Sequence, residues 1–238
     1  MSSIKLNVQA DDGIKKFPGL PSGIKCVVFD CDGVLVDAIS SWRTLHDYFG
    51  TDNSENLRRF IAGEFSDVEF MRSDIKLWKA KKDPIHRDEL FRAYSGSKLM
   101  DGARELVSWL KDNGCFVAIV SAGVDLFVGS IASMLGADDW VANGFIFDED
   151  GYLTDEGNCR LHATGKGEII EKLCQQHGFE GKEVISVGDS EMDLSMWIKD
   201  SKFIGFNPTR ESSKQAFQDA GVPVINIRNC LEIKKFLD

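Results

Sequence analysis

The sequence predicts an α/β protein: a Rossmann-like parallel sheet with helices on both faces, and a small all-helical cap inserted after the first strand. Through most of the 238-residue chain, short apolar runs of strand character alternate with amphipathic stretches of helical character. This alternation is typical of parallel strands joined by crossover helices. Residues 40–98 differ, because they contain helical patches and many charges but no strand-like run, and this predicts the cap.

Three parts of the chain are predicted from these patterns. Residues 1–22 carry scattered polar residues and end in Phe17-Pro-Gly-Leu-Pro21, which favours an arm that lies on the core surface or is partly disordered. Residues 23–39 and 99–238 form the α/β core, and residues 40–98 form the cap. The hydrophobic content of 43% is sufficient for one sizeable core with a modest insertion.

The elements follow in order. The first strand covers Cys26–Phe29, and the cap helices follow, the first of them ended by Gly50. Later strands are expected at 116–120, 184–187, 203–206 and 222–227, with a β-hairpin at 145–147 and 152–153. Helices are expected at 102–113, 124–135, 168–177, 212–220 and 231–237.

Two aspartates follow the first strand on alternate residues, Asp30 and Asp32, and Gly33 comes next. Asp32-Gly33 alone is better interpreted as an ordinary turn. A carboxylate at the end of a buried strand is costly unless a partner neutralises it, and no basic residue lies beside this pair. Oxygen ligands of this kind suit Mg²⁺.

Three later stretches favour the metal-site interpretation. Ser121 directly follows a strand-like run, and Asp189 and Asp193 follow another. In an open parallel sheet, ligands gather at the carboxyl ends of the strands, so these side chains can share one crevice. Lys166 begins a predicted helix, where a cation opposes the helix dipole and therefore indicates a nearby anion.

This combination resembles the haloacid dehalogenase-like superfamily of phosphatases. Its four motifs are Asp-x-Asp, a Ser or Thr after a strand, a Lys, and Gly-Asp-x-x-x-Asp, and all four are present in order. The resemblance covers 24–237 and is closest to the phosphoserine phosphatase branch, notably over 102–197. Four motifs in this order make the signal strong, although each is weak alone.

The resemblance implies a role for each motif residue. Asp30 is the nucleophile that forms an aspartyl phosphate, and Asp32 is the general acid and base. Mg²⁺ is held by the Asp30 carboxylate, the Asp32 backbone carbonyl and Asp189. Asp193 does not coordinate the ion directly but orients these ligands or acts through a water molecule. Lys166 pairs with Asp30 and with the phosphate.

Phosphate oxygens are expected to contact the Ser121 hydroxyl and the backbone N–H groups of Ala122, Asp32 and Gly33. Arg72 falls near the place where phosphoserine phosphatases carry a cap arginine, so we predict that it contacts an anionic part of the substrate. The alternative is a surface arginine on a charged helix.

The substrate side of the chain departs from the phosphoserine phosphatase pattern. Ile39 replaces a glutamate that binds the amino acid part, Met192 replaces an asparagine, and Gly33-Val34 replaces Ser-Thr. An ammonium group would lose its carboxylate partner, so we predict that phosphoserine is a poor substrate compared with a phosphorylated hydroxy acid, sugar or other metabolite. The alternative is that a cap acid, Glu64 or Asp67, replaces the missing glutamate.

The predicted function is Mg²⁺-dependent hydrolysis of the phosphate monoester of a small metabolite. A phosphotransferase or phosphomutase of the same superfamily would keep the same motifs, and a non-catalytic regulatory relative would need a broken motif, which is not found. A net charge of −10 argues against nucleic acid as partner.

The chain has no apolar run of the ~18 residues that a membrane span needs. Its six scattered cysteines fit reduced thiols in the cytoplasm. The oligomeric state does not follow from the sequence.

Overall fold

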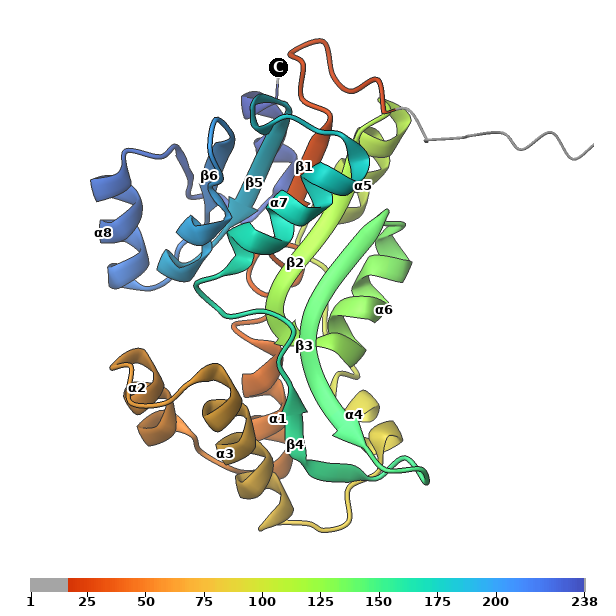
Figure 1. Ribbon diagram of the computed structural model, residues 1–238, viewed down its shortest axis with the longest axis vertical. Helices are drawn as coiled ribbons and strands as arrows, with labels where there is room; N and C mark the ends of the chain where they lie inside the picture. The colour runs from red at the N-terminus through yellow and green to blue at the C-terminus, as the bar shows by residue number, and fades with distance from the viewer. Residues whose placement is uncertain (1–16, 238) are drawn as a thin grey trace, which may run out of the picture.

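The structure is a computed structural model that describes residues 17–237, so most of the predicted N-terminal arm lies outside it. Its centre is a seven-stranded sheet with the order β4-β3-β2-β1-β5-β6-β7 (Figure 1). All neighbouring strands are parallel except the β3–β4 pair, which is antiparallel. The strands are β1 (Cys26–Phe29), β2 (Phe116–Val124), β3 (Asp139–Phe147), β4 (Leu153–Asn158), β5 (Val184–Gly188), β6 (Lys202–Phe206) and β7 (Val224–Ile225).

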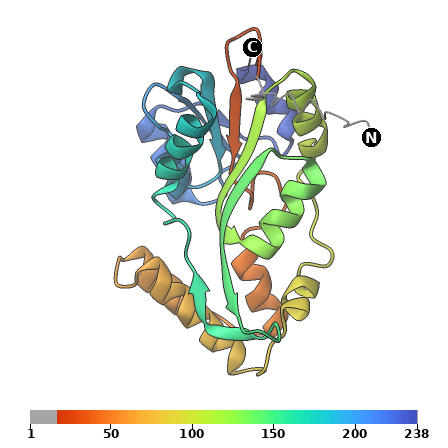
Figure 2. The ribbon, with the colours of Figure 1, turned by 45° about the vertical axis from the view of Figure 1, so that its right-hand side comes forward.

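Helices cover both faces of the sheet, as Figure 2 shows. The alternation of β1 explains why both faces must be covered, since Val27 and Phe29 belong to one apolar cluster while Cys26 and Val28 belong to the other. All four side chains are fully buried. The first cluster includes residues of α5 (Ala103–Asp112), α6 (Asp125–Leu135) and the 3-10 helix η3 (Cys230–Phe236), and the second includes residues of α7 (Lys166–His177) and α8 (Glu211–Ala220).

The segment after β1 is helical, as predicted. It contains α1 (Ser41–Phe49), α2 (Ser54–Ile61), α3 (Asp67–Lys79) and α4 (Arg87–Ala93). Gly50 ends α1 in the left-handed conformation, and Ser66 begins α3 with a capping box to Glu69. The β3–β4 hairpin extends beyond the core and packs against α3, as Figure 1 shows. The exact boundaries of the predicted cap stay a prediction.

Three elements differ from the sequence-based expectation. β3 begins at Asp139 and pairs in parallel with β2 before it turns into the hairpin. Its first residues, Asp139 and Trp140, carry no strand alternation, so the pairing with β2 and not local propensity makes them a strand. β7 has two residues, and the C-terminal helix η3 is a 3-10 helix.

Among residues 17–237, no helix is both long and apolar enough to cross a membrane.

Candidate active site

The predicted site residues meet at one edge of the sheet because β1 and β5 end there in register with the neighbouring part of β2. Phe29 of β1 lies opposite Ile119 of β2 and Val187 of β5. The residues that follow, including Asp30 and Asp189, therefore emerge at the same edge. They line a cleft of about 380 Å³, together with Asp32, Ser121, Ala122, Lys166 and Asp193.

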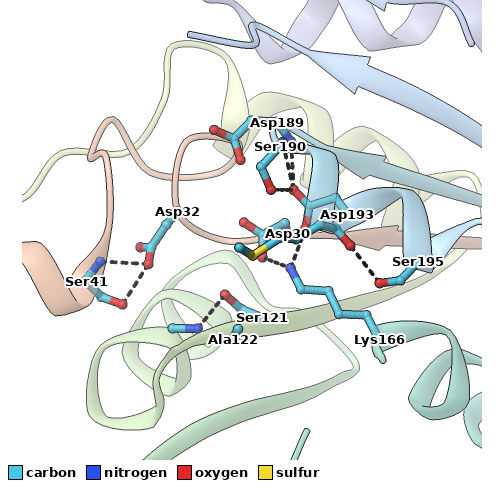
Figure 3. A network of polar contacts seen from close by, with 12 residues as sticks. Asp30, Asp32, Ser41, Ser121, Ala122, Lys166, Asp189, Ser190, Asp193 and Ser195 are labelled. Carbon is cyan, nitrogen blue, oxygen red and sulfur yellow. Dashed lines mark hydrogen bonds and ion pairs between the residues drawn. The ribbon is translucent and has the colours of Figure 1, made fainter. Parts of the chain in front are cut away.

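Lys166 is the charge centre of this cleft. Its Nζ lies 2.6 Å from Oδ1 of Asp30 and 2.6 Å from Oδ1 of Asp193, and its side chain is 4% exposed (Figure 3). Burial lowers the pKa of Lys166, but the Asp193 and Asp30 carboxylates more than offset that effect, so the net pKa is raised. Lys166 therefore stays protonated, and the predicted contact with Asp30 is present.

The Asp193 carboxylate is held by a local network of hydrogen bonds. Its Oδ2 accepts hydrogen bonds from the backbone N–H groups of Asp189 and Ser190 and from the Ser190 hydroxyl, at 2.8 to 3.1 Å. Its Oδ1 accepts from Lys166. A carboxylate with four donors suits the orienting role predicted for Asp193 better than direct coordination of a cation.

Gly33 gives Asp189 its position. A Cβ on Gly33 would lie 2.5 Å from Asp189 Oδ2, and the φ of +78° at Gly33 favours glycine as well. The Gly33 N–H donates to the Val36 carbonyl at 3.0 Å, and its predicted phosphate contact stays a prediction. Gly33 thus acts through the tight turn and the space it leaves.

The acidic cluster fits a hard divalent cation. Carboxylate oxygens of Asp30, Asp189 and Asp193 lie within 4.8 Å of one another. Burial, followed by the charge of neighbouring carboxylates, raises the pKa of Asp189 to about 8, and burial raises the pKa of Asp30 to about 7 despite Lys166. The raised pKa values show that Lys166 alone does not compensate for the charge of the fully ionised cluster. The atoms that the cluster offers to a cation are all oxygens, as Mg²⁺ prefers.

Asp32 is fixed from the opposite side of the cleft. Its Oδ2 accepts hydrogen bonds from the backbone N–H and the hydroxyl of Ser41, both at 2.7 Å (Figure 3). Its Oδ1 is buried and has no hydrogen-bond partner among the described residues. Burial raises the pKa of Asp32, and the bonds from Ser41 reduce that rise.

The Ser121 hydroxyl can donate a hydrogen bond into the cleft. Its hydroxyl oxygen accepts the Gly123 N–H at 3.1 Å, which leaves the O–H hydrogen for another acceptor in the cleft. The Ala122 carbonyl accepts from the indole N–H of Trp42 at 3.0 Å, so a residue of α1 holds the end of β2 that carries the predicted phosphate contact of Ala122.

The structure does not bring Arg72 to the cleft. The Arg72 guanidinium forms a bidentate ion pair with Glu156 at 2.8 to 3.2 Å, and the two side chains are about half exposed. The predicted contact of Arg72 with a substrate stays a prediction. In this geometry the ion pair with Glu156 must break before Arg72 can contact a substrate. Glu64 pairs with Arg59.

Asp67 is also engaged at the start of α3. It accepts hydrogen bonds from His162 at 2.8 Å and from the Ala163 N–H at 3.0 Å. Neither cap acid that was weighed as a replacement for the missing glutamate lines the cleft. Ile39 and Met192 do line it, and Ile39 is 77% exposed.

The sequence pattern did not predict the bond from Ser41 to Asp32 or the bond from the Trp42 indole to Ala122. The one signal for Ser41 is a pair of serines before that helix, which ordinarily indicates a cap; here Ser40 makes no side-chain capping bond. Arg210 and Arg228, which also line the cleft, lie outside the four motifs.

Comparisons with known proteins agree with this geometry. A family model described as haloacid dehalogenase-like hydrolase matches residues 24–198. Phosphoserine phosphatase of Archaeoglobus fulgidus is 30% identical over 215 residues, which cover 90% of this chain and 60% of that protein. Phosphoserine phosphatase of Methanocaldococcus jannaschii is 29% identical over 216 residues, which cover 90% of this chain and 97% of that protein.

Solved structures give the same relationship. A substrate-bound phosphoserine phosphatase complex superposes with a TM-score of 0.75 at 25% identity, over 90% of this chain and 99% of the other. A phospho-aspartyl intermediate analogue of phosphoserine phosphatase also gives 0.75, at 26% identity and the same coverage. The chain therefore belongs to the haloacid dehalogenase-like hydrolases and is a phosphatase related to the phosphoserine phosphatases.

Proposed function

We propose that the protein hydrolyses the phosphate monoester of a small metabolite through an aspartyl phosphate on Asp30, with Mg²⁺ as cofactor. The observation that carries this proposal is the meeting of Asp30 with Lys166, beside Asp189 and Asp193, at the carboxyl edge of the sheet. A nucleophilic carboxylate, a buried cation and an acidic cluster are the groups that phosphoryl transfer requires.

In the first step an Asp30 oxygen attacks phosphorus, and the bond between phosphorus and the leaving oxygen breaks. Asp32 gives its proton to that oxygen, so the alcohol leaves neutral. Lys166 and the Ser121 hydroxyl hold the phosphoryl oxygens as charge redistributes. Mg²⁺ held by Asp30, Asp189 and the Asp32 carbonyl would supply positive charge that reduces repulsion between the carboxylate and the phosphate.

In the second step water attacks phosphorus and the bond to Asp30 breaks. Asp32 accepts a proton from the water and is thereby restored to its acid form. Inorganic phosphate is released, and Asp30 is again a carboxylate. Lys166 stays beside Asp30 throughout, so the leaving carboxylate is stabilised as it forms.

The substrate side of the cleft favours a metabolite without an ammonium group. Ile39 lines the cleft and offers no charge. Asp37 lines it too, but its carboxylate pairs with Arg228. Arg210 adds a second guanidinium at the cleft. A phosphorylated hydroxy acid or sugar therefore suits this cleft better than phosphoserine does.

The test is release of inorganic phosphate from a panel of phosphate monoesters, including phosphoserine, phosphoglycolate and sugar phosphates, with Mg²⁺ and with chelator. Asp30→Asn is the control for contaminating phosphatase. Release that needs both Mg²⁺ and Asp30 supports the proposal. Transfer to a sugar acceptor without free phosphate would instead establish a phosphotransferase. A cytoplasmic location is part of the proposal and is tested by fractionation of the source cells.

A further inference from the structure

Ser41 holds the catalytic acid, although it does not line the cleft. Its side chain is fully buried. It is the first residue of α1, the first helix of the cap segment, and its backbone N–H and hydroxyl both donate to Oδ2 of Asp32 at 2.7 Å. Two donors of this kind fix both the position and the rotation of the Asp32 carboxylate.

The Ser41 hydroxyl is itself fixed. It accepts the backbone N–H of Val124 at 2.9 Å, at the end of β2. A hydroxyl has one proton, so with this bond made its O–H points to Asp32. The space around this junction is tight, since a Cβ on Gly123 would lie 2.7 Å from the Ser41 hydroxyl and 2.8 Å from Asp32 Oδ2. The backbone carbonyl of Ser41 accepts the Tyr94 hydroxyl at 3.3 Å.

The two carboxylate oxygens of Asp32 are thereby made different. Oδ2 faces two donors, so it accepts and carries no proton. Oδ1 has no partner among the described residues, and Asp32 lines the cleft. The geometry points to Ser41 as the positioning residue that reserves Oδ1 of Asp32 for proton exchange with the leaving oxygen and the attacking water.

This inference rests on the proposed function and deepens it. In the first step the Oδ1 proton passes to the leaving oxygen as the bond from phosphorus to that oxygen breaks, and in the second step Oδ1 receives a proton from water. Without the Ser41 hydroxyl, the carboxylate can rotate and exchange its two oxygens. The proton transfer then loses part of its alignment, while Asp30 and Lys166 keep theirs.

The experiment compares two substrates that differ in their need for an acid. An alkyl phosphate has a poor leaving group that must be protonated, whereas p-nitrophenolate leaves without a proton. Ser41→Ala is expected to lower kcat/KM, which reports only the steps up to departure of the leaving group, by about 10- to 100-fold for the alkyl phosphate but by less than about threefold for p-nitrophenyl phosphate, a partial loss of what a general acid contributes. KM should change little, because Ser41 is outside the cleft.

Thr44→Ala is the matched control, since it removes a hydroxyl from the same helix that bonds only to the Ser40 carbonyl in the described structure. In an Asp32→Asn background, Ser41→Ala should have no further effect on the alkyl phosphate. Equal losses of kcat/KM on both substrates, or an undiminished loss in that background, would show that Ser41 is merely structural and overturn the inference. A wild-type protein that hydrolyses neither substrate would overturn the proposed function itself.

Discussion

The core side and the cap side of the cleft hold their side chains in different ways. On the core side, Asp30, Lys166 and Asp193 are nearly fully buried, and Nζ of Lys166 lies 2.6 Å from a carboxylate oxygen of each aspartate. On the cap side, Ile39 is 77% exposed and Arg72 is engaged in a surface ion pair. Ser41 is the exception, because it belongs to a cap helix but bonds to Asp32.

This contrast separates chemistry from substrate choice. Groups that are proposed to act on the phosphoryl centre are preorganised by buried contacts, which need no rearrangement at the moment of reaction. Groups that are predicted to meet the rest of the substrate are exposed or paired at the surface, and surface pairs contribute only about 0–1 kcal/mol. Substitutions on the core side should therefore change kcat, whereas those on the cap side should change KM and substrate preference.

The largest expected effect is that of Asp30→Asn. The substitution removes the nucleophile but almost no volume, so turnover should fall to background while thermal unfolding shows an intact fold. Steady-state phosphate release with and without added Mg²⁺ measures this effect. Activity that persists in Asp30→Asn at saturating Mg²⁺ would contradict the mechanism.

The second largest effect is expected from removal of the divalent cation. Excess chelator should stop turnover, because the carboxylate cluster and the phosphate then repel each other. Full activity in excess chelator, unchanged when Mg²⁺ is added back, would count against the metal site.

The same cluster predicts a pH dependence of stability in the metal-free protein. Folding raises the pKa of Asp30 from 3.8 to about 7 and that of Asp189 from 3.8 to about 8. The folded state thus binds more protons, so the free energy of unfolding should decrease as the pH rises from about 4 to 8. Mg²⁺ should then raise the melting temperature more at pH 8 than at pH 5. An equal rise at both pH values would contradict these shifts.

Lys166→Ala should lower kcat by about 10²–10³-fold, because it removes the cation that stabilises the phosphoryl group and the departing carboxylate. Lys172→Ala is the matched control, since Lys172 lies on the same helix with an exposed side chain. Kinetics of both variants on one substrate at saturating Mg²⁺ measure the effect. A loss of the same size in both would assign it to the helix and not to the charge at the cleft.

Ile39→Glu should shift substrate preference toward phosphoserine. A carboxylate at the cleft would pair with the ammonium group, and we expect kcat/KM for phosphoserine relative to phosphoglycolate to rise about tenfold, within the range of close charge pairs. Ile39→Gln, which is equally large but neutral, separates charge from size. No change in the ratio would mean that the ammonium group is bound elsewhere or not at all.

The smallest effect is expected at Arg72. If Arg72 contacts the substrate, it must first leave Glu156, so Arg72→Ala should raise KM only about two- to fivefold, as expected for an exposed pair. Glu156→Gln should release the guanidinium and lower KM. The two variants therefore have opposite effects under the prediction, and an unchanged KM in both would make Arg72 a surface arginine.

The sequence by itself determined the parts that depend on local pattern and order. An apolar run that ends in Asp30 predicts a buried strand with a carboxylate at its end, and the order of later strands places Asp189 at the same edge. Lys166 could be predicted because a cation at a helix start indicates a nearby anion. The predicted helices after β1 and the β-hairpin were also found.

Only the tertiary structure decided which polar atoms pair. Arg72 meets Glu156 across 84 positions of the chain, and Ser41 meets Val124 across 83. The turn after β1 directs the Gly33 N–H to the Val36 carbonyl. Hydrophobic periodicity specifies which face of an element is buried, but it carries no information about the rotamers and distant partners of polar side chains, which are set when the elements pack.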